Sequence, residues 1–345
     1  MSSTSTSRTR LTDLADMAGV STATVSRVLN GKPGVAGETR QSVLQALDLL
    51  GYERPERLRG RSVGLIGLVV PELTNPVFPL FAQRISASLA SSGFTPLLCT
   101  QVAGGTTEDE FTEMLRDHGV DGIVFVSGLH ADRKASTERY HRLRSDGVPM
   151  VLVNGYIDGL DASFISADDV EAMELAVRHL SSLGHQQIGL AVGPDRFTPV
   201  VRKIEGFAAA MKQNLGVIDT APWVSSSLFT LEGGQAAAKE LIEKGCTGIV
   251  CASDVMALGA VKAARALGLR VPEDVSVIGY DDSPLIAFTD PPLTTIRQRV
   301  EEMSAAAVNA LLSEIGGGGA PRTELVYSPE LIVRGSTAPA PPRPS

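Results

Sequence analysis

Cysteine, aromatic residues and long apolar runs are all scarce in this sequence. It has three cysteines in 345 residues (Cys99, Cys246 and Cys251), too few for a disulfide framework and without the spacing of a zinc site. No apolar run approaches the roughly 18 residues that a membrane span needs. The first residues, MSSTSTSRTR, lack the apolar centre of a secretory signal. We therefore expect a cytoplasmic protein with reduced, buried thiols and no membrane segment.

The sequence motifs of common enzyme classes are also missing. There is no P-loop, GxSxG or HExxH, and GLIGLVVPE at 64–72 lacks the glycine pattern of a dinucleotide-binding turn. The five histidines fall mostly on expected helices or loops, where a surface or internally hydrogen-bonded ring is the ordinary interpretation: His118, His130, His141, His179 and His185. We expect neither catalysis nor a bound cofactor or metal.

The net charge of −8 hides an uneven distribution. Residues 1–61 contain nine basic and six acidic residues, whereas the remaining chain contains 22 basic and 33 acidic ones. A basic head on an acidic body indicates that the head binds a polyanion.

From Val63 onward, apolar runs of strand length alternate with segments of helical spacing. The runs cover residues 63–70, 94–100, 122–127, 149–154, 187–193, 248–253 and 275–280, with a last strand near 323–333. The expected helices cover 77–92, 107–118, 132–146, 168–183, 199–214, 231–244, 254–267 and 297–315. This alternation predicts parallel sheets in two α/β halves, whose ligand loops lie at the carboxyl ends of the strands.

The N-terminal residues predict three short helices. The first, 11–18, ends at Gly19, and Ser21 fits the N-cap of a second helix, 22–29. A third helix, 38–50, closes a small core. Two short helices joined by a tight turn are typical of a helix-turn-helix, whose second helix enters the major groove of DNA.

Arg27 is the strongest candidate for base recognition, because arginine can donate two hydrogen bonds to guanine. A solvated arginine on an exposed helix is the alternative that these residues alone leave open. The candidate DNA contacts on and beside the second helix are Ser21, Thr22, Ala23, Thr24, Ser26, Arg27 and Asn30.

An ordered series of segments resembles one known family. AGVSTATVSRVLNGKPGV (18–35) resembles the DNA-binding head of the LacI–GalR family of bacterial repressors. Further matching segments follow in the order of the family: VVPELTNPVF, DGIVFVSG, GP…GF, CASDVMALGAV, VPEDVSVIGYDD and PPLTTIRQ. The resemblance covers about residues 9–335. It implies an all-α helix-turn-helix head and a periplasmic-binding-protein-like α/β body, with two parallel-sheet lobes around a cleft.

The pattern and the resemblance together give a division of the whole chain. We expect a disordered tail (1–8), the helix-turn-helix domain (9–52), a hinge (53–62), the two-lobed body (63–335) and a second disordered tail (336–345). Within the body, the N-lobe covers about 63–155 plus a late crossover, the C-lobe about 156–290, and return segments 291–335.

The hinge is where this chain departs from the family. The resemblance implies that two hinges pair in a dimer and insert Leu58 into the minor groove, with Arg54 and Arg57 near phosphates. A central CpG is expected, since pyrimidine–purine steps kink easily. The segment before the first strand is about three residues shorter than is usual in the family. A flexible basic linker is the alternative.

The cleft residues are assigned by motif position. Asn154, Ser253 and Asp281 follow apolar strands and match cleft contacts of the family, while Asn75 and Phe78 would form the opposite wall. We place Arg202 in the cleft, beside Lys203, which stands where the family usually has arginine. Alternatives remain: a helix N-cap for Asp254, a turn aspartate for Asp281 and a core position for Phe78.

The resulting hypothesis is a ligand-controlled, dimeric, DNA-binding repressor. A sugar or nucleoside-like effector in the cleft would change its affinity for a pseudopalindromic operator. Induction and co-repression both remain open. A sugar-binding transport receptor is the alternative, against which the DNA-binding head argues.

Overall fold

The computed structural model describes residues 4–30, 32, 34–51, 63–102, 104–319 and 323–342, with side chains from residue 11 onward. The chain divides into two compact units, Met1–Val63 and Gly64–Ser345. The first unit is called the head below, and the second the body.

Three helices form the head: α1 (Thr4–Ala18), α2 (Thr22–Leu29) and α3 (Gly37–Leu49). Their buried side chains meet in one small core: Leu14, Ala15, Val25, Val28, Val43, Ala46 and Leu47. The expectation of a disordered tail over residues 1–8 is wrong from Thr4 onward, where α1 already begins. Extending an existing helix requires no new nucleation, so α1 continues into the Ser/Thr-rich segment.

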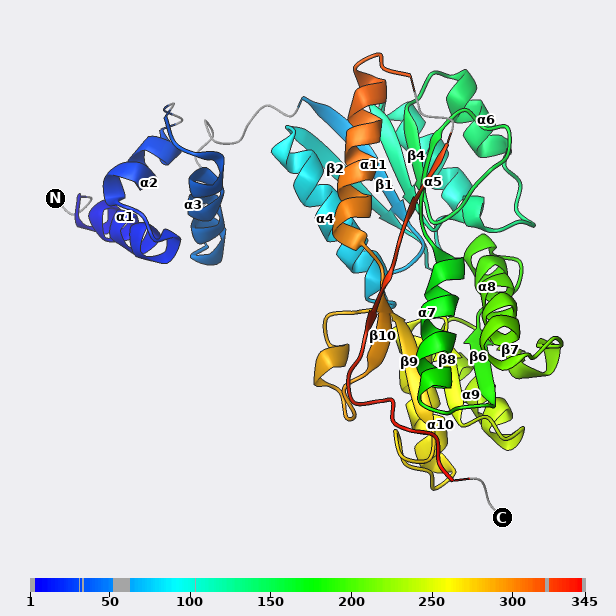
Figure 1. Ribbon diagram of the computed structural model, residues 1–345. Helices are drawn as coiled ribbons and strands as arrows, with labels where there is room; N and C mark the ends of the chain where they lie inside the picture. Colours follow the sequence, from blue (N-terminus) through cyan, green and yellow to red (C-terminus); the bar gives the residue numbers. More distant parts are fainter. Residues whose placement is uncertain are drawn as a thin grey trace. The chain divides into compact units, whose positions relative to one another are not determined.

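Two six-stranded sheets form the body, one in each lobe (Figure 1). The N-lobe sheet has the order β11-β5-β4-β3-β1-β2, and the C-lobe sheet the order β12-β10-β9-β8-β6-β7. The N-lobe strands are β1 (Gly64–Val70), β2 (Phe94–Thr100), β3 (Gly122–Val126), β4 (Met150–Val153), β5 (Ser163–Ala167) and β11 (Glu324–Tyr327). The C-lobe strands are β6 (Ile188–Val192), β7 (Val224–Ser226), β8 (Gly248–Cys251), β9 (Ser276–Asp281), β10 (Thr294–Arg297) and β12 (Glu330–Ile332). The two lobes thus repeat one strand order, and all neighbouring strands are parallel except β10 and β12.

Helices cover both faces of each sheet, as parallel sheets require. In the N-lobe, α4 (Val77–Ser91) and α11 (Val300–Ile315) pack together on one face, and α5 (Glu108–Asp117) and α6 (Glu138–Ser145) lie on the other. In the C-lobe, α7 (Asp169–Ser182) pairs with α8 (Thr198–Leu215), and α9 (Leu231–Glu243) pairs with α10 (Asp254–Ala266). Short 3₁₀ turns η2 (Leu129–Ala131), η3 (Ala221–Trp223) and η4 (Ile286–Phe288) complete the body.

The chain passes between the lobes three times, after β5, after β10 and between β11 and β12 (Figure 1). The N-lobe therefore extends beyond the expected boundary at residue 155, because β5 pairs with β4 in the N-lobe sheet. Ser163 and Ser166 interrupt the apolar run of β5, which hid this strand from a search for continuous apolar segments.

The expectation of a disordered tail after residue 335 is also wrong for residues 336–342, the part of this tail that the structure describes. The Ser336 hydroxyl donates to the Val277 carbonyl (2.6 Å) and accepts from the Thr294 amide (2.8 Å). The Ala338 carbonyl lies 3.1 Å from Nε2 of His185. Proline prevents regular secondary structure, yet Ser336 and Ala338 just before the prolines and Ala340 between them hydrogen-bond to the C-lobe.

The three cysteines are free and buried, as expected. His185 is buried, and both ring nitrogens hydrogen-bond with hydroxyl groups, Nδ1 with that of Thr247 and Nε2 with that of Ser276. The described part of the chain has no helix long and apolar enough to cross a membrane.

Candidate DNA-binding surface and ligand cleft

Side-chain hydrogen bonds to the backbone define both ends of α2. The Ser21 hydroxyl accepts a hydrogen bond from the Thr24 amide at 3.2 Å, and this satisfies a free donor of the first turn. Gly19 has a φ of 64°, in the left-handed region that favours glycine. At the other end, the Asn30 side-chain amide donates to the Ser26 carbonyl at 2.7 Å. The structure confirms the predicted bounds of this helix.

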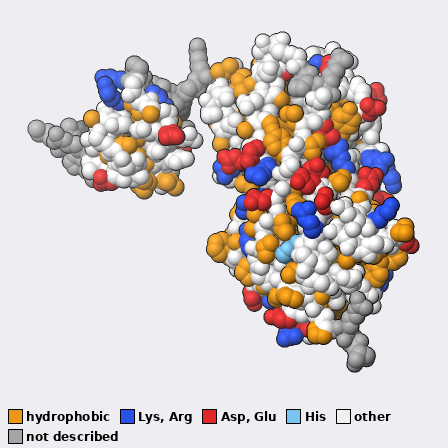
Figure 2. Space-filling model, viewed as in Figure 1, with side chains coloured by type: hydrophobic (Ala, Val, Ile, Leu, Met, Phe, Trp, Pro, Cys, Tyr) orange, Lys and Arg blue, Asp and Glu red, His pale blue; other side chains and the backbone are white. Residues whose placement is uncertain are grey.

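The buried and exposed faces of α2 separate cleanly. Val25 and Val28 point into the head core. Ser21, Thr22, Ala23, Arg27 and Asn30 are exposed, whereas Thr24 and Ser26 are half-buried. Figure 2 shows basic side chains gathered at one edge of the head. The outer face of α2 therefore carries the residues expected to contact DNA.

The hinge candidates cannot be placed in the same way. Arg54, Arg57 and Leu58 lie outside the described residues, and their roles stay predictions.

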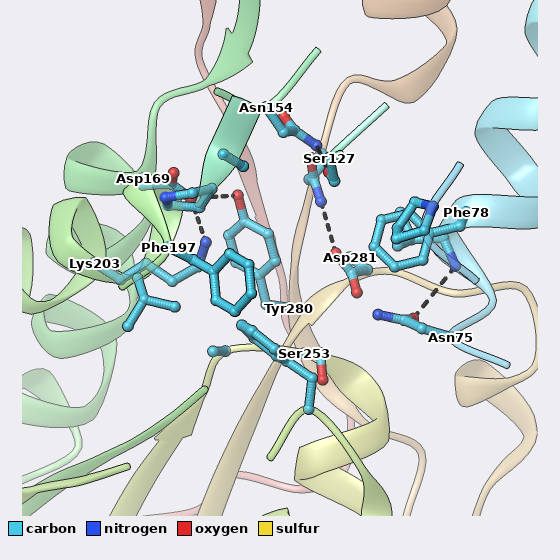
Figure 3. A pocket seen from close by; sticks show the side chains of 18 of the residues that line it. Asn75, Phe78, Ser127, Asn154, Asp169, Phe197, Lys203, Ser253, Tyr280 and Asp281 are labelled. Atoms are coloured by element: carbon cyan, nitrogen blue, oxygen red, sulfur yellow. Dashed lines mark hydrogen bonds and ion pairs between the residues drawn. The ribbon is translucent and has the colours of Figure 1, made fainter. Parts of the chain in front are cut away.

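A cavity of about 200 Å³ lies between the lobes of the body (Figure 3). Residues at or just after the ends of β1, β3, β4, β8 and β9 line it, so carboxyl ends from both sheets meet there. The lining residues are Pro71, Glu72, Asn75, Val77, Phe78, Ser127, Ala131, Asn154, Asp169, Phe197, Pro199, Val200, Lys203, Phe229, Ala252, Ser253, Tyr280, Asp281 and Gln298.

Three of the strand ends at this cavity have unusual backbone geometry. Ser127, Asn154 and Asp281 have φ values of 48°, 62° and 113°, which residues other than glycine rarely adopt. Such strain persists where the surrounding structure enforces it, and it concentrates at binding sites. The backbone turns at these strand ends and directs short polar side chains into the cleft.

Asp281 is a deeply buried acid of the cavity, 5% exposed. Its Oδ1 accepts a hydrogen bond from Gln298 Nε2 at 2.6 Å, and its buried Oδ2 has no hydrogen-bond partner. Burial and the nearby carboxyl of Asp254 raise its pKa well above the ordinary value, while the side-chain amides of Gln298 and Asn75 and the charge of Lys203 act in the opposite direction. This oxygen is therefore available to a donor that enters the cleft.

Lys203, the cation among the described lining residues, is held by its neighbours. Its ammonium group forms an ion pair with Asp169 and lies 3.9 Å from the centre of the Tyr280 ring. The Tyr280 hydroxyl donates to the same carboxylate oxygen of Asp169 at 2.9 Å. The three side chains form one buried group on the C-lobe side of the cavity (Figure 3).

Two expectations about the cleft are wrong. Arg202 is not among the residues that line the cavity, and its guanidinium donates to both carboxylate oxygens of Glu324, at 2.7 and 2.8 Å. Asp254 does not cap the following helix, because the hydroxyl of Ser253 takes that position by accepting from the Met256 amide.

Other expected cleft residues do meet at the cavity. Asn75, Phe78, Asn154, Ser253 and Asp281 all line it, although their contact with a ligand stays a prediction. Phe78 also packs against the N-lobe core, so its expected place in the cleft wall and the alternative core position are both correct.

The sequence analysis missed several lining residues, notably Lys203, Asp169 and Phe229. A signal for Lys203 existed, since Val200, Lys203 and Phe207 recur at helical spacing and are all buried on one face of α8. Phe229 lies in a loop before α9, where no periodic pattern marks it.

Comparisons with known proteins agree with both the helix-turn-helix head and the two-lobed body. The family of bacterial regulatory proteins, lacI family, matches residues 10–55, and the periplasmic binding protein-like domain matches residues 177–337. The chain is 64% identical over 336 residues to the HTH-type transcriptional regulator MalR of Streptomyces coelicolor, covering 96% of this chain and 98% of the relative. This chain belongs to the lacI family of DNA-binding transcriptional regulators. It is a regulator and not an enzyme.

Solved structures resemble this regulator over nearly its whole length. The transcriptional regulator CelR–cellobiose complex matches with a TM-score of 0.71 and 31% identity, covering 94% of this chain and 99% of that one. The lac repressor dimer bound to operator and the anti-inducer ONPF matches with a TM-score of 0.69 and 27% identity, covering 94% and 98%.

Proposed function

We propose that this chain is a dimeric regulator that binds its operator through α2 and responds to an uncharged, hydroxyl-rich ligand in the interlobe cavity. One observation carries the ligand proposal: Asp281 Oδ2 is buried, has no partner and belongs to a residue that lines the cavity. A carboxyl oxygen left in this state costs free energy until a donor reaches it. A ligand hydroxyl is a suitable donor.

The charges of the cavity favour an uncharged ligand. Three acids line it, Glu72, Asp169 and Asp281, against the single cation of the described lining, Lys203. That cation is already paired with Asp169. A phosphate group would meet two further carboxyl groups and no free positive charge, which disfavours phosphorylated ligands.

Aromatic side chains supply the apolar part of the same site. Phe78 belongs to the N-lobe wall, and Phe197 and Phe229 to the C-lobe wall. The two C-lobe rings meet edge to face, with centroids 6.1 Å apart. Apolar walls with a few convergent polar groups are typical of small-molecule sites, and flat rings suit the C–H faces of a sugar. The CelR complex with cellobiose supports this ligand class.

An exposed apolar surface supports the dimer. Leu73, Leu285 and Phe288 are 45%, 75% and 85% exposed, and the first two line a groove beside α4 and α10. Exposed apolar patches of this kind mark interfaces. We assign a second copy of this chain to the groove, because the similar lac repressor binds its operator as a dimer. Paired heads also match a two-fold operator.

The DNA proposal is tested by selection from random duplexes. The wild-type protein is expected to enrich a pseudopalindrome around a central CpG, and Arg27→Ala to lose the enrichment. If both proteins enrich the same sequence equally, Arg27 has no role in base recognition.

The ligand proposal is tested by calorimetric titration with cellobiose, maltose, ribose and glucose 6-phosphate. At least one neutral sugar is expected to bind, and Asp281→Ala to abolish that binding. Asp274→Ala serves as the matched control, because Asp274 pairs with Arg270 and is not among the residues that line the cavity. Binding of glucose 6-phosphate alone would refute the uncharged ligand class.

A further inference from the structure

The first two turns of α8, with the residues just before them, contact both the cavity and the opposite lobe. Phe197, Val200 and Lys203 line the cavity. Arg196 precedes Phe197 and Arg202 precedes Lys203, and both arginines pair with N-lobe residues instead. One C-lobe segment therefore forms a cavity wall and joins the two lobes.

The first connection between the lobes runs from η2 to the segment before α8. Arg196 Nε lies 3.1 Å from Asp132 Oδ2, and Asp132 is buried. Next to this ion pair, the Arg133 amide donates to the Arg196 carbonyl at 2.9 Å, and Asp132 and Phe197 form an isolated β-bridge. Backbone and side chains thus connect the lobes at the same point.

The second connection is the pair of Arg202 with Glu324, which lies in β11 of the N-lobe sheet. Both hydrogen bonds are short, and the two side chains are 26% and 16% exposed. A bidentate, partly buried arginine–carboxylate pair is stronger and more directional than an exposed one.

The residues of both connections are close neighbours of residues at the cavity. Ala131 lines the cavity beside Asp132, and Phe197 lines it beside Arg196. Arg202 precedes Lys203. Figure 2 shows positive and negative side chains interleaved where the two lobes meet. Separation of the lobes would break both connections and open the cavity wall.

We propose that the pairs Asp132–Arg196 and Arg202–Glu324 form an interlobe latch that sets the balance between closed and open lobes in the absence of ligand. Both pairs join residues of different lobes in the observed arrangement, so they stabilise that arrangement and the cavity it encloses. The regulatory consequence rests on the proposed function, because it concerns the same cleft. Weakening the latch raises the ligand concentration needed for a response.

The Arg133 amide reports on the latch directly, since its hydrogen-bond partner is in the other lobe. We would measure amide hydrogen exchange of the ligand-free, full-length protein over residues 129–136. The variants are Arg202→Gln, Glu324→Gln and the double variant. A charge-reversed pair is unsuitable, because Asp168 and Asp169 act electrostatically on Arg202. Arg270→Gln is the matched control, because it removes a bidentate pair with Asp274 inside the C-lobe.

Each single variant is expected to raise exchange at Arg133 by about three- to tenfold, and the double variant by no more than a single one. Exchange in β3 and in the Arg270→Gln control should stay unchanged. Wild-type exchange at Arg133 in both single variants would overturn the latch. Equal acceleration across the N-lobe would also overturn it, since that result indicates general destabilisation.

A second measurement connects the latch to ligand. Cellobiose titration of the same variants should show a weaker apparent affinity, in proportion to the fraction of closed protein that is lost. If wild-type protein binds no neutral sugar, the proposed ligand class fails, while the exchange experiment still decides the latch.

Discussion

The DNA-binding surface and the ligand cleft of this regulator are assembled in opposite ways. The candidate DNA contacts that the structure describes lie within ten consecutive residues, 21–30, on one helix and its ends. The cleft collects side chains from Pro71 to Gln298, supplied by both sheets. A surface built on one helix depends on a small local core, whereas a cleft depends on the packing and relative position of two lobes.

The largest expected effect comes from a core substitution in the head, which should abolish DNA binding without affecting ligand binding in the cleft. Leu14 is buried in the head core, and Leu14→Ala is expected to cost about 2–5 kcal/mol. A unit of this size has a free energy of unfolding of only about 3–8 kcal/mol. DNA binding should therefore collapse while cleft ligands still bind, as measured by operator titration and calorimetry on one preparation. Loss of ligand binding would show that the two units do not fold independently.

A smaller effect is expected at the surface of the same unit. Arg27→Ala should weaken operator binding by about 1–3 kcal/mol, because it removes hydrogen bonds to a base edge. Affinity for random duplex should change much less, and the head should keep its melting temperature. The comparison uses fluorescence titrations of both duplexes at one salt concentration. Equal losses on both would assign Arg27 to phosphate contacts.

The contrast between head and cleft also explains what the sequence could predict. The bounds of α2, its cap at Ser21 and the turn at Gly19 follow from neighbours within four residues, and the structure confirms them. Most strand positions in the body followed from apolar runs in the same way. The buried strand β5 did not, because its serines resemble a loop until β4 and β11 pair with it.

The adjacent cations Arg202 and Lys203 show how far the cleft residues can be predicted from the sequence. Both are basic, and Lys203 stands where the family usually has arginine, but we placed Arg202 in the cleft because lysine lacks the planar fork of arginine. Helical periodicity, which puts Lys203 on the buried face with Val200, was the better guide. The partners Asp169 and Glu324 lie 34 and 122 residues from these cations, so only the folded chain identifies them. Ser336 similarly finds its partners Val277 and Thr294 only through the fold.

The third prediction concerns how pH acts on the cleft. The pKa of Asp281 is raised in the folded protein by burial and by Asp254. Its contribution to stability is therefore full below the unfolded value of about 4 and is lost as the pH rises toward the folded value. Asp281→Asn cannot ionise and therefore avoids this loss of stability. At neutral pH the variant should have a higher melting temperature than wild type, and the difference in melting temperature should shrink as the pH is lowered.

A control of opposite sign accompanies this prediction. Arg270 lowers the pKa of Asp274 to about 2, so that carboxylate stabilises the fold above its unfolded pKa and ceases to do so as the pH falls. Asp274→Asn should therefore melt lower than wild type at neutral pH. If the two variants shift the melting temperature in the same direction, Asp281 does not carry the electrostatic cost assigned to it.

The smallest expected effect is the loss of a helix N-cap hydrogen bond, which can be compared between the head and the body. Ser21 caps α2 in the head, and Thr230 caps α9 in the body by accepting from the Gly233 amide at 3.0 Å. Replacing either by alanine removes one cap hydrogen bond, at a cost of about 1 kcal/mol. The same loss should lower the melting temperature by about 4–8 °C in the small head, but by about 2–4 °C or less in the body.

Scanning calorimetry of the two variants measures both transitions in one experiment. Ser21→Ala should move only the head transition, and Thr230→Ala only the body transition. Because α2 carries the DNA contacts, Ser21→Ala should also weaken operator binding as the temperature approaches the lowered head transition, whereas Thr230→Ala should not. Equal shifts in both units would mean that the head shares the stability of the body, and the independence on which the whole comparison rests would then be wrong.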